Sequence, residues 1–246
     1  MSVTGLYMAR RVHHSAFTYV KAYGQSVLEY VIPAFANLSE RAAVIAASEF
    51  ERLGEQPTEE GCDGDMSVAA EAAQDKGQAF YDTLVAIRQT SLNLFAAGLF
   101  HLLEQQLTDL CLDGAFDKLP PTDTNLCVIA KWYHRNFNLD LYKLPTWPKI
   151  EQLRDLANSV KHGEGKSVAK LRVNRPDLFQ DPNLLELLPN FPRMHTAQVV
   201  RLPMAGADIF VTTQIFAEFS QAANSFVAEI AEYFVAHQRE HYLVGG

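Results

Sequence analysis

Apolar side chains recur every three to four residues along most of the chain, the spacing of an α-helix with one buried face. The pattern predicts helices over residues 15–35 and 39–54. Residues 66–112 keep this spacing almost without interruption, so we expect one long helix there. No turn signal divides this stretch, so a bend or break is expected only at Gly77 or Gly98.

The second half of the chain alternates helical patterns with connections rich in proline and glycine. A helix capped by Asp123 or Thr124 is expected to run to about residue 136. The next helix is expected over residues 148–162. Thr146 is a natural N-cap, and Pro148 in the first turn costs nothing because its missing N–H would have no partner there.

The last third contains shorter elements before a final long helix. A short helix is expected around residues 184–188, and residues 198–203 and 208–212 look like the two strands of a small β-hairpin. The final helix runs from about residue 213 to 237. The sequence therefore predicts an all-α bundle of five or six helices, with one long helix and a minor β-hairpin, in a single domain over residues 1–246.

Composition narrows the class of protein. Hydrophobic residues make up 48% of the 246 positions and charged residues 20%, enough apolar surface for a real core. No apolar run is long enough to span a bilayer, and the N-terminus lacks the features of a secretory signal. The three cysteines fit reduced thiols and form no metal-binding pattern. We therefore expect a cytoplasmic protein with no membrane segment, metal or cofactor. The cysteines are Cys62, Cys111 and Cys127.

Charge is distributed unevenly. The chain carries a net charge of −8, which argues against a protein that coats nucleic acid. Residues 149–175 hold seven Lys and Arg against three acids, a net charge of +4 that leaves −12 for the remainder. A local basic site on an acidic body suits a confined anionic ligand. The alternative is a solvated surface segment.

One face of the predicted helix 148–162 concentrates groups that can bind phosphate and move a proton. With Arg154 at zero, Asn158 lies at about 40°, Lys161 at about −20° and His162 at about 80°. The helix ends at Gly163, a typical C-terminal glycine. The alternative interpretation is that any amphipathic helix collects its polar residues on the solvent side.

Two other patterns are candidate sites. The segment HGEGKS at residues 162–167 is not a phosphate-binding P-loop, because Val160 stands where the motif needs its first glycine. His101 and Glu104 have the i, i+3 spacing of carboxylate-bridged metal sites in helical bundles. No second Glu-x-x-His motif accompanies them, so a metal-dependent bundle enzyme is only the third hypothesis.

The chain resembles the HEPN-type helical bundles of bacterial toxin–antitoxin and phage-defence systems. The resemblance rests on long helices over about residues 66–237, preceded by a helical pair at 15–54, and on a nine-residue motif. That motif runs from Arg154-Asp155 to Lys161-His162. Seven residues separate its Arg from its His, where the family usually has four to six.

The resemblance implies a homodimer that cuts RNA without metal in a cleft at its two-fold interface. Arg154 would stabilise the phosphate, and His162 would exchange a proton with the ribose 2′-hydroxyl or the leaving oxygen. Asn158, Lys161 and Lys166 would bind the RNA strand. Several family members cleave nothing and instead bind partners. The alternative is therefore a non-catalytic helical module for a protein partner, such as an antitoxin, or for a small anionic ligand.

Overall fold

The computed structural model of the chain is all-α. Its described residues form α-helices joined by π- and 3₁₀-helical turns, with no β-strand among them, which confirms the fold class. None of these helices has an apolar stretch long enough to cross a membrane. The structure describes residues 5–55, 66–112, 119, 121–191, 196–201 and 206–237.

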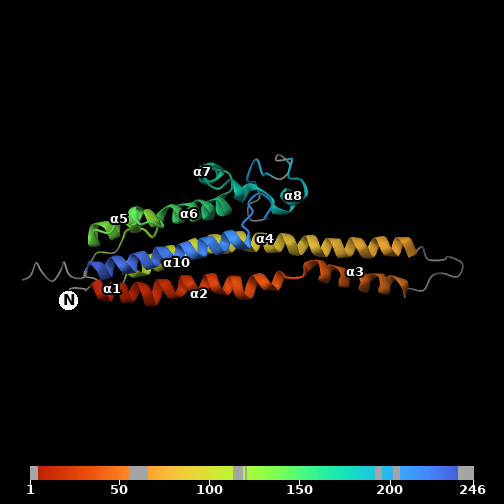
Figure 1. The fold of residues 1–246 in the computed structure, drawn as a ribbon, viewed down its shortest axis with the longest axis horizontal. Helices are drawn as coiled ribbons and strands as arrows, with labels where there is room; N and C mark the ends of the chain where they lie inside the picture. Colours follow the sequence, from red (N-terminus) through yellow and green to blue (C-terminus); the bar gives the residue numbers. More distant parts are fainter. Residues whose placement is uncertain are drawn as a thin grey trace, which may run out of the picture.

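The N-terminal helices form an almost continuous rod (Figure 1). α1 (Gly5–Val12) and α2 (Thr18–Ser26) are joined by a π-helical turn, and a second π turn and a 3₁₀ turn continue the rod to Phe35. The helix predicted to begin at residue 15 therefore begins earlier. Asn37 then adopts a left-handed conformation, with φ of 56°, and redirects the chain into α3 (Leu38–Gly54).

α4 (Met66–Leu112) is a single helix of 47 residues, as the sequence predicts. Its glycines do not break the helix. Instead, they allow neighbouring helices to pack closely against it. A Cβ on Gly77 would lie 2.9 Å from Ala46 Cβ, and one on Gly98 would lie 2.5 Å from the Tyr23 hydroxyl. Both positions therefore mark where a neighbouring helix approaches α4.

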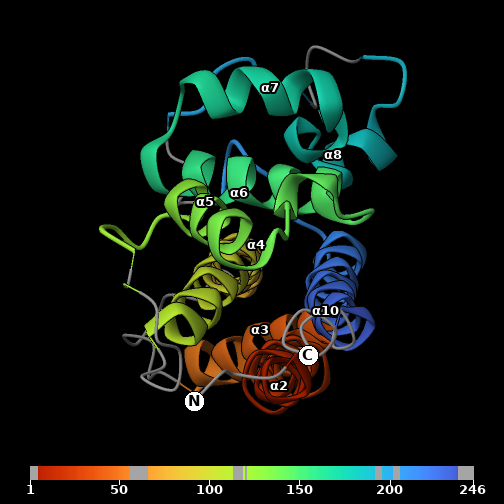
Figure 2. The same ribbon diagram turned by 90° about the vertical axis from the view of Figure 1, so that its left-hand side faces the viewer.

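The remaining helices form a second layer and a returning helix. Figure 2 shows α5–α8 on one side of the paired α4 and α10, with α2 and α3 on the other side. α5 is capped by Asn125, which accepts a hydrogen bond from the Val128 N–H; Asp123 and Thr124, the predicted caps, lie outside the helix. The described residues contain more helices than the expected five or six, because α1 and α2 are separate and the short α7 and α8 add to the count. The bounds are α5 (Leu126–Phe137), α6 (Trp147–His162), α7 (Lys166–Asn174), α8 (Pro182–Leu187) and α10 (Thr213–Ala236).

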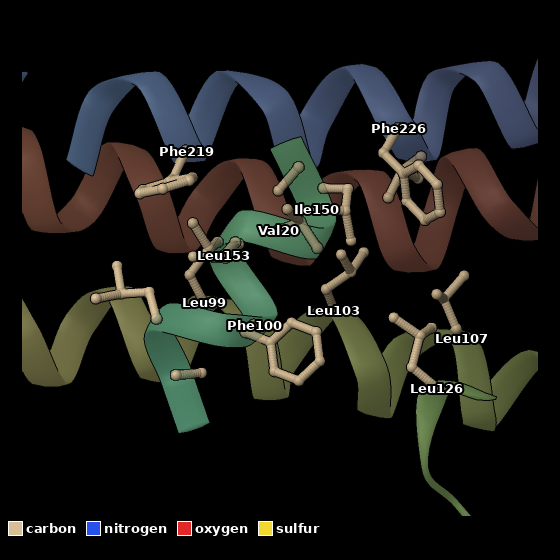
Figure 3. Close-up of a cluster of buried hydrophobic side chains, with 14 of the residues drawn as sticks. Val20, Leu99, Phe100, Leu103, Leu107, Leu126, Ile150, Leu153, Phe219 and Phe226 are labelled. Carbon is tan, nitrogen blue, oxygen red and sulfur yellow. The ribbon is translucent and has the colours of Figure 1, made fainter. Parts of the chain in front are cut away.

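α6 packs its apolar side against α4 and α10 (Figure 3). Its residues Ile150 and Leu153 are fully buried in the core. The same core includes the buried Val20 of α2, so it joins the N-terminal rod to the rest of the bundle. Core residues labelled in this view include Val20, Leu99, Leu103, Phe219 and Phe226.

The predicted β-hairpin is wrong for the described residues of its two strands. The described residues of the two segments share no backbone–backbone hydrogen bond: the Arg201 N–H bonds to the Asp208 side chain at 2.7 Å, and other groups bond to neighbouring elements. The Val200 carbonyl accepts the Glu164 N–H at 3.0 Å, and the Phe210 N–H donates to the Leu178 carbonyl at 2.8 Å. The buried Asn93 side chain of α4 accepts the Val211 N–H at 3.1 Å. Residues 202–205, part of the predicted hairpin, lie outside the described residues.

The packing of α6 into the core can be tested with a matched pair of Leu→Ala substitutions. Leu153→Ala removes a fully buried side chain, whereas Leu187→Ala changes an exposed one. We expect Leu153→Ala to lower the free energy of unfolding by about 2–5 kcal/mol, and Leu187→Ala by less than about 0.5 kcal/mol. Urea denaturation followed by circular dichroism measures both, and equal effects would contradict the assignment of the core.

Candidate functional site

The helix that carries the predicted site is fixed by its apolar side. Leu156, Ala157 and Val160 are buried, which turns the polar positions of α6 away from the core. Thr146 precedes the helix but does not cap it with its side chain. Its hydroxyl instead contacts the Glu229 carboxylate of α10, so this residue ties the two helices together.

Arg154 is held in a network of ion pairs between α6 and α7. Its guanidinium lies 2.9 Å from Glu151 and 3.6 Å from Asp155, and its side chain is only 26% exposed. Lys170 of α7 approaches the same two carboxylates at 3.8 and 3.9 Å. The Ser167 hydroxyl donates to Asp155 at 3.3 Å. Arg154 therefore neutralises carboxylates of its own protein.

This network is not among the sequence predictions, although part of its signal is visible in the sequence. Glu151 precedes Arg154 by three residues, a spacing that brings opposite charges together on a helix surface. The less obvious member is Asp155, whose side chain is 7% exposed because α7 covers it. A carboxylate this buried needs cations nearby, so Arg154 and Lys170 have a structural role.

Three of the predicted site residues lie together at the turn between α6 and α7. Lys161, His162 and Lys166 are exposed, and we call these three residues the basic corner. Arg154 precedes His162 by eight residues, about 12 Å along the helix axis. Asn158 lies between them and is half-buried. The Lys and His positions therefore flank one turn of the chain, whereas Arg154 lies about two helical turns away.

The turn that forms the basic corner is fixed by its backbone. Gly163 has a φ of 73°, and a Cβ at this position would lie 3.2 Å from the Val200 carbonyl oxygen. The neighbouring Glu164 carboxylate accepts the Val200 N–H at 2.8 Å and pairs with Arg172 at 3.3 Å. The predicted role of Gly163 as the glycine that ends the helix is confirmed.

Most other cations of the basic segment are neutralised locally. Arg175 is the most buried, and it lies 2.8 Å from Asp177, 3.4 Å from Glu218 and over the Phe219 ring. Its hydrogen bonds hold the pKa of Asp177 below the usual value. The five ion-paired cations of residues 149–175 are Lys149, Arg154, Lys170, Arg172 and Arg175.

His101 and Glu104, the pair considered for a metal site, have a structural role. His101 Nδ1 lies 3.6 Å from a Glu104 oxygen, and the other Glu104 oxygen accepts the Leu126 N–H at 2.8 Å. Glu104 thus satisfies a backbone donor at the start of α5. Among the described residues, no three His, Cys, Asp or Glu form a group suited to a metal ion. Cys111 and Cys127 are free thiols, and Cys62 lies outside the described residues.

Comparisons with protein-family models, with curated proteins and with solved structures found no match to this chain. They neither support nor contradict the resemblance to HEPN proteins. The function is therefore inferred from the arrangement of the residues themselves.

The structural role of the α6–α7 network can be tested at Asp155. We expect Asp155→Asn to lower the free energy of unfolding by about 1–3 kcal/mol, because two cations lose a buried partner. Asp109→Asn changes an exposed carboxylate on α4 and serves as the control, with an expected effect below about 0.5 kcal/mol. Chemical denaturation of both variants gives the comparison. If Asp155→Asn were as stable as Asp109→Asn, the α6–α7 network would have no role in stability.

Proposed function

We propose that the chain is a non-catalytic helical binding module that recognises phosphate groups of its ligand at the basic corner. One observation carries the proposal. Of the seven Lys and Arg in residues 149–175, only Lys161 and Lys166 take part in no ion pair with another described residue. Both lie at one turn, with the exposed His162 between them.

The local charge supports an anionic ligand. Two unpaired lysines on a body with a net charge of −12 outside the basic segment form a confined positive site, which attracts anions to one place. α7 begins at Lys166, and no side chain caps its first turn. The free N–H groups of that turn add positive potential at the same corner. Lysine is an established phosphate-binding residue, which favours a phosphate group as the ligand.

The position of Arg154 favours binding over cleavage. A phosphate that used Arg154 would have to replace Glu151 and Asp155 as partners of the guanidinium. The lysines of the basic corner, by contrast, have no carboxylate partner among the described residues to give up. Among the HEPN proteins that the chain resembles, such a site would correspond to the members that bind partners and do not cleave RNA. The ribonuclease hypothesis, with Arg154 and His162 as catalytic residues, stays a prediction.

The binding proposal is tested by removing both unpaired lysines. We expect the double variant Lys161→Gln/Lys166→Gln to weaken binding of a labelled single-stranded RNA about five- to tenfold at low salt. Lys131→Gln, an exposed lysine on α5, should change the affinity less than about twofold. Fluorescence anisotropy at several salt concentrations measures the affinity. The salt slope should fall by about 0.7 for each phosphate that the double variant no longer binds.

A parallel titration with ATP identifies the source of the phosphate. Binding of ATP and RNA at the same corner would indicate a nucleotide site, whereas binding of RNA alone would indicate a strand-binding surface. Equal affinity in the wild type and the double variant would contradict the proposal. Binding of a polyglutamate peptide in place of both phosphate ligands would also contradict it.

The ribonuclease hypothesis has its own test. Labelled RNA is incubated with the protein in chelator, beside Arg154→Ala and His162→Ala. The binding proposal predicts that all three preparations leave the RNA intact. Cleavage by the wild type that disappears in both variants would replace the proposal with the HEPN-like ribonuclease.

A further inference from the structure

A pocket of about 780 Å³ lies where four parts of the chain meet, and we call it the junction pocket. It is lined by the turn from the N-terminal rod into α3, by one face of α4, and by the first residues of α8 and α10 (Figure 1). Its volume is that of a small-molecule site. None of its lining residues belongs to the basic corner, so a ligand here would be a separate one.

Two long helices begin at the junction pocket, and both leave backbone donors free. No side chain caps α3, and the N–H groups of residues 38–40 have no acceptor among the described residues. α10 begins at Thr213, whose N–H is also free, because the Thr212 side chain caps a later N–H of the first turn. Free N–H groups at a helix start attract anions.

Arg88 of α4 adds a cation to the same pocket. Its side chain is exposed and takes part in no ion pair with another described residue. The neighbouring Gln89 side chain donates to the Val211 carbonyl at 3.1 Å, which brings this part of α4 next to the start of α10. Arg88 and the free N–H of Thr213 therefore line one region of the pocket.

The charges around the pocket leave a small positive excess. Glu40 of α3 also lines the pocket, and it is not ion-paired with Arg88, so both side chains keep their charges available. These two charges balance, and the two helix starts add about half a positive charge each. The excess is therefore equivalent to about one positive charge, which suits a monoanion.

The Thr213 hydroxyl gives a second and independent indication of a ligand. Its oxygen is buried and has no hydrogen-bond partner, although Thr213 lies on the turn of α10 that lines the pocket. Buried hydroxyl groups are nearly always hydrogen-bonded. An anion at the start of α10 would supply the acceptor that this hydroxyl lacks.

The rest of the junction pocket is largely apolar. Leu92 and Val211 are buried, and the other apolar side chains that line it are only partly covered by the protein. An inorganic ion would leave this surface in water, whereas an organic ligand with an apolar body would cover it. The apolar lining includes Ile32, Phe35, Val85, Leu92 and Val211.

We propose that the junction pocket binds a small organic carboxylate with an apolar body. The carboxylate lies at the start of α10 and pairs with Arg88, whose planar guanidinium matches its two oxygens. The apolar body lies against the side chains of α4 and of the turn into α3. A phosphate monoester carries a charge of about −1.5 to −2, which exceeds the positive excess of the pocket and would be repelled by Glu40.

Titrations with phenylacetate test the charge requirement. We expect phenylacetate to shift the amide NMR signals of residues 38–40 and Thr213 with about millimolar affinity. Its neutral amide, phenylacetamide, should bind about fivefold more weakly or worse. Arg88→Gln should weaken phenylacetate binding about fivefold and remove the preference over the amide. Arg135→Gln, at an exposed position on α5 outside the pocket, should change the affinity less than about twofold.

Two further variants test the roles of Glu40 and Thr213. Glu40→Gln should strengthen phenylacetate binding about threefold and allow phenyl phosphate, which the wild-type pocket rejects, to bind there. Thr213→Val should weaken phenylacetate binding about threefold while leaving the Tm of the free protein unchanged, because the hydroxyl has no bond within the protein to lose. Circular dichroism of every variant checks that the helices remain folded.

Several results would overturn the proposal. Equal affinities for phenylacetate and phenylacetamide would show that charge plays no part. Shifts confined to residues outside the junction pocket, or an affinity unchanged in Arg88→Gln, would show that the ligand binds elsewhere. Tighter binding of phenyl phosphate than of phenylacetate in the wild-type pocket would contradict the assigned ligand class. None of these variants alters Lys161 or Lys166, so phosphate binding at the basic corner succeeds or fails separately.

Discussion

The burial of α6 between α4 and α10 is the interaction on which the rest of the structure depends. Its fully buried residues Ile150 and Leu153 join helices that are far apart in sequence. Because this contact fixes the rotation of α6, it also fixes where each polar side chain of that helix lies. Asp155 falls under α7 and must be neutralised, whereas the end of the helix emerges at the surface. Ion-paired cations and the exposed lysines at the end of α6 are thereby separated within one short segment.

A second consequence follows from the unequal lengths of the packed helices. α4 has 47 residues and α10 has 24, so α10 can cover only part of α4. The uncovered part packs mainly against α3. Two helices bury little apolar surface between them. Small residues at their contact, such as Gly77, bring the two backbones close and leave a groove beside the contact.

The candidate site shows how far helical periodicity can predict chemistry. Wheel geometry placed Arg154, Asn158, Lys161 and His162 on one side of a helix, and that helix exists with the expected end at Gly163. Periodicity carries no information about what lies opposite each residue. The carboxylates that engage Arg154 are on its own helix, but the cover that buries Asp155 comes from α7. Only that packing distinguishes a paired cation from an available one.

The sequence by itself determined the all-α class, the extent of α4 and the positions of α3, α6 and α10, because apolar spacing and helix-ending residues are local signals. Tertiary structure decided what local signals cannot encode. The β-branched stretches near residues 200 and 210 satisfy their backbone groups on α4, on Glu164 and on the chain near Leu178, so they do not form a hairpin. Gly77 and Gly98 lie at helix contacts and not at bends. Whether a glycine bends a helix or allows a close contact depends on its neighbours, and only the folded chain provides those neighbours.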